Sequence, residues 1–223
     1  MIHEMKISLP LPKQACALCF VVILSLVRGV SDSYEIGVAL EAPLAILAVS
    51  LCADTYTQEI VCGRSEIQRL YPLKKRVCSV YGRMAIQELF LLAVAVIGYG
   101  LFFLFQNPET AQTGQSGQGG EMCQFLVYFA AITVTLGFWG LLSNLLSILF
   151  RNMWMGIGCC LLLWLFTNSS AGDRCLGAWN LFSYSFRRLG NDGDLSWLCG
   201  KMVCISLGIM AAAALPKIIE KRG

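Results

Sequence analysis

The chain has 223 residues, of which 57% are hydrophobic and 14% are charged, and its formal net charge is +3. Soluble domains carry about 25% charged residues, so this composition excludes an ordinary soluble protein and indicates a membrane protein. We expect a single membrane domain, 1–223, without a soluble catalytic domain, and we expect no nucleic-acid partner.

The first fourteen residues, Met1–Gln14, mix charged and apolar side chains and contain Pro10 and Pro12. This pattern predicts an amphipathic entry helix on the membrane surface, interrupted by the prolines. The apolar block Ala15–Val30 follows. A basic start before an apolar block also fits a cleaved signal peptide, but no A-x-A-like site follows Val30, which favours a retained span.

Apolar blocks recur along the rest of the chain. About 20 such residues cross a hydrocarbon core about 30 Å thick. We therefore predict an all-α membrane protein with six transmembrane helices. The second predicted span contains Glu41 and Pro43, so we expect its outer half to be irregular, and the fifth is short. The six predicted spans are Ala15–Val30, Ile36–Ala53, Val77–Phe105, Met122–Phe150, Met153–Phe166 and Leu198–Ile219.

A basic, polar segment, Thr57–Arg76, separates the second and third spans. Apolar residues recur in it at helical spacing, charged residues occupy the other faces, and Pro72 ends the pattern. This predicts an amphipathic helix at the membrane surface. The alternative is a basic loop that only sets topology. The apolar positions are Ile60, Ile67, Leu70 and Tyr71, and the charged ones are Glu59, Arg64, Glu66 and Arg69.

The distribution of lysine and arginine predicts the topology. With six spans, four basic regions fall on one side, and the facing loop Gln106–Glu121 has no lysine or arginine. We therefore expect a multi-pass protein of the cell membrane with both termini cytoplasmic. The longer segment Asn168–Trp197 is rich in aromatic residues, including Trp179, Phe182 and Tyr184, and is predicted to lie in the outer interface as a re-entrant or surface helix.

Ionisable residues inside spans are candidate functional residues, because a charge is costly to bury there. Glu41, next to Pro43, is the strongest candidate for a pathway or gate. Arg28 lies near the outer end of the first span and would reach Glu41 if the two helices are antiparallel neighbours. The alternative is a purely structural pair of Arg28 with Glu35 or Glu41. Glu88 is expected to face a cytoplasmic vestibule, and Lys201 to extend to the outer surface.

Neither metal nor catalytic chemistry is indicated. The eleven cysteines include Cys16-Ala-Leu-Cys19, but no second CxxC completes a zinc site. His3 is the only histidine, which argues against a metalloprotease and against a histidine general base. Cys175 and Cys199 would both lie near the external face, where an oxidising compartment would allow them to pair.

The basic segment resembles the coupling-helix region of ABC-2 type transporter permeases. The resemblance is carried by Glu59, Gly63, Glu66, Leu70 and Pro72, followed by basic residues at the start of the third span, with Arg64 inserted between Gly63 and Ser65. The six spans, the entry helix and the short basic end also resemble small bacterial permeases that work with a separate ATPase.

This resemblance implies that the helix within Thr57–Leu70 docks on an ATPase subunit, which would bind ATP and Mg²⁺, whereas this chain has no Walker A sequence and no cofactor of its own. A second permease copy or a related subunit would complete the pathway within the lipid. Export of a peptide, drug or other amphiphile is the expected activity. The alternatives are a substrate-binding component of a vitamin or metal importer, a structural or regulatory membrane protein, and an intramembrane enzyme.

Overall fold

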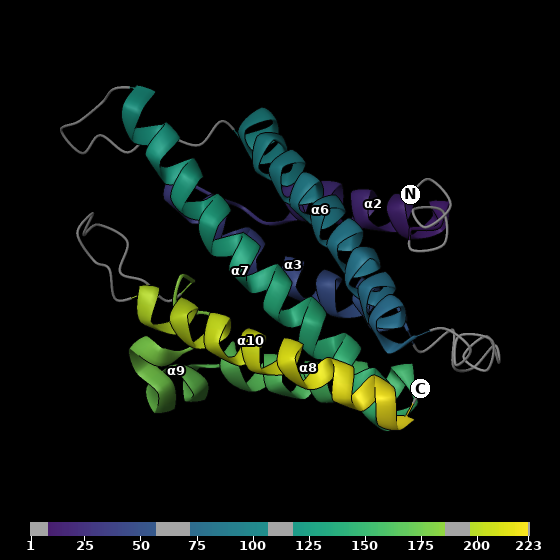
Figure 1. Cartoon of the computed structure of the whole chain (residues 1–223). Helices are drawn as coiled ribbons and strands as arrows, with labels where there is room; N and C mark the ends of the chain where they lie inside the picture. Colours follow the sequence, from purple (N-terminus) through teal and green to yellow (C-terminus); the bar gives the residue numbers. More distant parts are fainter. Residues whose placement is uncertain (1–8, 57–71, 107–117, 186–196, 223) are drawn as a thin grey trace.

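The structure is a computed structural model that describes residues 9–56, 72–106, 118–185 and 197–222, and these ranges contain helices and no β-strand. Figure 1 shows long helices running side by side, with the N- and C-terminal ends at the same end of the bundle. The helices are α2 (Leu11–Val27), α3 (Ser33–Cys52), α6 (Leu73–Gln106), α7 (Gln118–Phe150), α8 (Met153–Thr167), α9 (Ser170–Leu176), η1 (Gly177–Trp179) and α10 (Trp197–Arg222).

Four of the described helices, α3, α6, α7 and α10, are long and apolar enough to cross a membrane. A fifth crossing results if α8 and the α9–η1 unit, which are bent by 74° at their junction, are counted as one span. The remaining apolar helix, α2, has 17 residues. A helix lies at each of the six predicted spans, but the count of six crossings stays a prediction.

Contacts at the helix ends fix the directions of the helices. Gln106, at the end of α6, donates to the carbonyls of Ser25 and Arg28 and accepts from the amide of Val30, so the end of α6 meets the α2–α3 turn. We call this the outer end. At the opposite, inner end, Tyr56 packs with residues of α6, α7 and α10. Helices α3, α7 and α10 therefore run from the outer to the inner end, and α2 and α6 run back.

The start of α2 corrects one prediction. The entry segment was expected to be broken by Pro10 and Pro12, but Pro10 is the residue before the helix and Pro12 lies in its first turn. Proline is tolerated there because the first amides of a helix have no partner within it. Lys13, predicted to lie on the surface, forms an ion pair with Asp54 just beyond α3. Residues 1–8 lie outside the described part of the chain.

Helix α3 is also more regular than predicted, because it continues through Pro43 without a break. The proline ring removes the hydrogen bond to the carbonyl four residues earlier, that of Ala39. Arg28 Nη1 lies 3.4 Å from this carbonyl oxygen and partly replaces the missing bond. Most of α3 is buried, because α6, α7 and α8 pack around it, so the charge of Glu41 lies on the most enclosed of the described helices.

The chain between α8 and α10 re-enters the bundle. Trp164, near the end of α8, donates its indole N–H to the carbonyl of Ala42 at 3.0 Å, which places the end of α8 beside the middle of α3. Beyond the bend and η1, the non-helical residues 180–184 are buried. The aromatic side chains of Phe182 and Tyr184 lie in the core, whereas Trp179 is exposed. Of the two predicted forms of this segment, re-entrant or surface helix, the buried residues fit the re-entrant one, although they are not helical.

Candidate functional site

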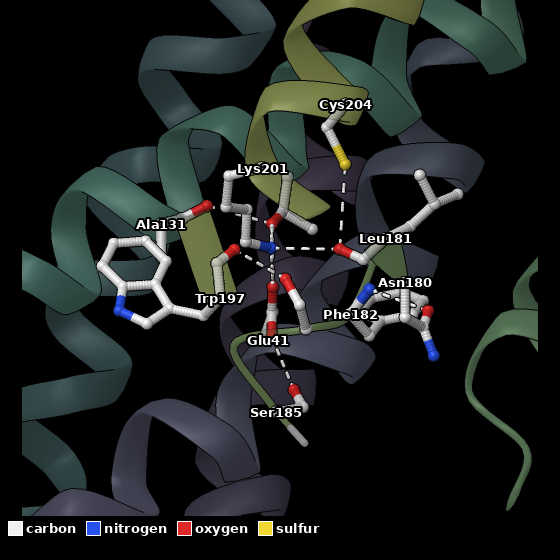
Figure 2. A network of polar contacts seen from close by, with 11 residues as sticks. Glu41, Ala131, Asn180, Leu181, Phe182, Ser185, Trp197, Lys201 and Cys204 are labelled. Carbon is white, nitrogen blue, oxygen red and sulfur yellow. Dashed lines mark hydrogen bonds and ion pairs between the residues drawn. The ribbon is translucent and has the colours of Figure 1, made fainter. Parts of the chain in front are cut away.

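The centre of the bundle holds an ion pair between Glu41 and Lys201, whose side chains are 1% and 3% exposed. Lys201 Nζ also donates to the Thr135 hydroxyl at 2.7 Å and to the Leu181 carbonyl at 3.2 Å. On the carboxylate, Thr135 Oγ1 lies 3.0 Å from Oε1, and Ser185 Oγ donates to Oε2 at 2.5 Å. Figure 2 shows Lys201 between Glu41 and Leu181, with Ser185 on the other side of the carboxylate.

Three helices and one non-helical segment supply this network. Glu41 comes from α3, Thr135 from α7 and Lys201 from α10, while Leu181 and Ser185 come from the buried segment 180–185. Glu41 lies about 12 Å along the helix axis from Ser33, at about 1.5 Å per residue. The site is therefore near the middle of α3, far from either end of the span.

The segment 180–185 is held in place by its own polar groups. Asn180 donates its side-chain amide to the Thr167 carbonyl at 2.9 Å, and its Oδ1 accepts from the Phe182 amide at 3.2 Å. The Ser183 hydroxyl donates to the Trp197 carbonyl at 2.7 Å. Non-helical backbone at membrane depth occurs only where protein or a cavity satisfies its polar groups. These hydrogen bonds meet that condition.

Each of the two buried charges compensates the other, and either one alone would destabilise the protein. Removing one partner of a buried ion pair costs about 3–5 kcal/mol, because the remaining charge is left without compensation. The Ser185 hydroxyl and the Leu181 carbonyl add hydrogen bonds to the two groups, and the Thr135 hydroxyl lies within hydrogen-bond distance of Glu41 and of the Ala131 carbonyl. The arrangement can hold a charge inside the bundle.

The other predicted site residues lie at different places. Arg28 donates to Ala39 rather than pairing with Glu41, so the predicted Arg28–Glu41 pair is wrong. Pro43 lies two residues after Glu41 in α3. Glu88 is half-buried on α6 against α7, where a carbon added at Gly137 would lie 3.4 Å from its Oε1.

The prediction for Lys201 was also wrong, since its ammonium points into the bundle and not to the outer surface. A lysine four residues into a helix is close enough to a membrane surface to extend to it, which is why its position alone suggested that role. Thr135 and Ser185 were missed as well. A serine or threonine gives no sequence signal of this kind, and their importance depends on a partner brought close by the fold.

A second polar cluster lies at the inner end, where α3 leads into the segment that resembles a coupling helix. Residues 53–56 are buried, and α2 and α6 hold them. Lys13 pairs with Asp54, the Thr55 hydroxyl donates to Gln87 at 2.7 Å, and Arg76 donates to the Tyr56 hydroxyl at 2.9 Å. Residues 53–56, which continue from α3, are thereby fixed to two further helices, α2 and α6.

The coupling-helix residues themselves lie outside the described part of the chain, so their predicted roles stay predictions. They are Glu59, Ile60, Gly63, Arg64, Glu66, Ile67, Leu70 and Tyr71. Cys175 and Cys199, which were considered as a disulfide, are free thiols in this structure.

Comparison with protein-family models, with curated proteins and with solved structures finds no match to this chain.

Proposed function

We propose that this chain is the membrane-spanning permease subunit of an ATP-driven transporter and that the Glu41–Lys201 pair is its closed gate. The observation that carries the proposal is a buried ion pair, near the middle of a membrane-length helix, that also contacts the non-helical segment 180–185. Ionisable residues at membrane depth mark substrate or ion pathways, and interrupted helices near the midplane hold the binding sites of many transporters.

The coupling to an ATPase rests on the resemblance of the segment around Glu66 to the coupling region of ABC-2 permeases. The inner polar cluster supports it, because residues 53–56 join this segment to α2, α3 and α6. A force applied by a docked ATPase would move these three helices together and would shift Glu41 on α3 relative to Lys201 on α10. The proposed location is the cell membrane, with both termini cytoplasmic.

Purification of the tagged full chain from the membranes of its own host tests the coupling. An ATPase with a Walker A sequence should co-purify, and Glu66→Lys should lower both the bound ATPase and its hydrolysis rate about tenfold, since it reverses a charge at the proposed contact. Gln115→Lys, in the loop predicted to face outside, is the control. Absence of an ATPase from the wild-type complex, or equal effects of both variants, would contradict the proposal.

A structural or regulatory protein without a transport role is the second candidate, favoured by the complete hydrogen bonding of the pair. The neutral double variant Glu41→Gln/Lys201→Met separates the two. A gate predicts that the folded double variant hydrolyses ATP in the complex without coupled transport, because the charges that hold the closed state are gone. Unchanged coupling would favour the structural role.

A further inference from the structure

The two halves of the ion pair are not equally fixed. The Glu41 carboxylate has two hydroxyl neighbours besides Lys201, those of Thr135 and Ser185, at 3.0 and 2.5 Å. Both come from elements other than α10. If the ammonium withdraws, the carboxylate keeps these neighbours, so a cation site remains at Glu41.

Lys201 has more freedom. It carries its charge on a flexible four-carbon stem, whereas a glutamate side chain is shorter. Apart from Glu41 it donates to the Thr135 hydroxyl and the Leu181 carbonyl, and the carbonyl remains available to it when Glu41 binds another cation. Lys201 can therefore leave the carboxylate and keep its contact with the Leu181 carbonyl.

Aromatic side chains line the outer side of the pair. Gly37, one turn before Glu41 on α3, lies against Tyr184 and Tyr128, where an added carbon would meet both rings within 3.1 Å. Trp197, one turn before Lys201 on α10, meets Tyr184 edge-on with ring centroids 5.7 Å apart. We call Tyr128, Tyr184 and Trp197 the aromatic collar.

The charge already present favours one sign of ligand. An anion would have to displace a carboxylate that the Thr135 and Ser185 hydroxyls contact. A cation would find that carboxylate in place, close to tyrosine and tryptophan rings, which are the side chains that attract cations most strongly.

We propose that Glu41 is the binding site for an organic cation, an ammonium group on an apolar body, which displaces the Lys201 ammonium. The inference rests on the proposed function and names its cargo class. Lys201 then acts as an internal cation that closes the empty site, and the aromatic collar contacts the apolar body of the cargo.

Binding of benzyltrimethylammonium to the purified full chain in lipid nanodiscs tests this inference, with benzoate as the anionic counterpart. Lys201→Met removes the internal competitor, so it should bind the cation about tenfold or more tightly than the wild type. The cation should also raise its thermal unfolding midpoint, because it compensates the unpaired carboxylate. Glu41→Gln and Glu41→Gln/Lys201→Met should not bind it. Isothermal calorimetry and thermal unfolding give the two readouts.

Equal cation binding by all four proteins would overturn the inference, since it would reflect partition into apolar surface. A folded Lys201→Met variant that binds no cation would overturn it too, as would benzoate binding to Glu41→Gln, which would make Lys201 the receptor. If Lys201→Met is recovered only when the cation is present during purification, and not with benzoate, that rescue is the expected result. If Lys201→Met is not recovered under any condition, the test is the comparison of two proteins. The wild type should bind the cation and Glu41→Gln/Lys201→Met should not, and equal binding by both would overturn the inference.

The outcome is separable from that of the proposed function. Transport by a complex whose permease binds no organic cation would reject only the cargo class. Cation binding at Glu41 by a chain that associates with no ATPase would reject only the coupling to ATP hydrolysis.

Discussion

Glu41 and Lys201 are opposite charges, 160 residues apart in the chain, that meet inside the bundle. Lys201→Met should destabilise the protein by about 3–5 kcal/mol, because it leaves the Glu41 carboxylate buried and unpaired. The neutral double variant Glu41→Gln/Lys201→Met should recover most of this loss. Unfolding in a mild detergent, followed by circular dichroism, measures the difference.

The exposed Lys217, on the same helix as Lys201, provides the control. Lys217→Met should change the free energy of unfolding by less than about 0.5 kcal/mol. A double variant as unstable as Lys201→Met alone would show that the two charges do not compensate each other, and this result would contradict the ion pair.

Of the two charged residues in the ion pair, the sequence predicts only Glu41 as a site residue. Glu41 is identifiable because it is an acidic residue in an apolar block, where an ionised group is costly. Its partner Lys201 is not identifiable from the sequence, because Arg28 is closer to Glu41 in the chain. Lys201 also lies near a helix end, where extension to the membrane surface is the simpler interpretation. The choice between them depends on the packing of α10 on α7, which no local pattern encodes.

Two of the helices that the structure describes contain an internal proline, and each proline leaves one carbonyl without its usual helical partner. In α3, Pro43 frees the Ala39 carbonyl, which Arg28 contacts from α2 at 3.4 Å. In α10, Pro216 frees the Ala212 carbonyl, which accepts from the Tyr81 hydroxyl of α6 at 2.7 Å. In both cases a side chain of another helix replaces the missing amide, so these prolines join helices together.

Tyr81→Phe should therefore destabilise the protein by about 1–3 kcal/mol, since it leaves the Ala212 carbonyl unpaired within an apolar helix. In a Pro216→Ala background the alanine amide can bond this carbonyl, and Tyr81→Phe should have less than about half the effect. Unfolding of the four proteins in this double-mutant cycle measures the coupling. An equal effect of Tyr81→Phe in both backgrounds would refute the link between the proline and the tyrosine.

The sequence predicts the helices well and their interruptions poorly. Apolar blocks locate the helices because every backbone polar group in a membrane must be satisfied within the protein. Pro43 was expected to make α3 irregular, but Arg28 and the surrounding helices keep it continuous. The segment 180–185 was expected to be part of a re-entrant or surface helix in the outer interface, because aromatic residues are typical of the interface. It is non-helical instead, and residues 180–184 are buried.

The two ends of the bundle differ in charge. Most of the described lysines and arginines outside the centre lie at the inner end, and Arg28 and Arg174 lie toward the outer end. The inner-end residues are Lys13, Lys74, Lys75, Arg76, Arg83, Arg151, Lys217 and Lys221. Positive residues are retained on the cytoplasmic side, so the inner end should face the cytoplasm.

An epitope inserted after Gln115 should bind its antibody on intact cells, because this loop is predicted to face outside. The same epitope after Ser65, or after Gly223, should bind only once the membrane is permeabilised. Antibody binding after Ser65 on intact cells would reverse the topology and would remove the basis for a cytoplasmic ATPase contact.

For the whole molecule, composition and apolar blocks were sufficient to predict an all-helical protein with several membrane-length helices. The number of crossings was not predictable, because α8 is short and its continuation bends by 74°. A hydropathy pattern records length and polarity, but it does not record the direction in which the chain continues after Thr167.

The reactivity of Lys201 in native membranes is the most direct test of the central claim, that its charge is closed inside the bundle by Glu41. A membrane-permeant acetylating reagent, followed by mass spectrometry, compares Lys201 with the exposed Lys74 in the same molecules. We predict that in the wild type Lys201 is modified about tenfold or more slowly than Lys74. In Glu41→Gln, Lys201 should be modified faster than in the wild type, because without the ion pair the reagent reaches it after local opening alone. Modification of Lys201 as fast as Lys74 in the folded wild type would contradict the account.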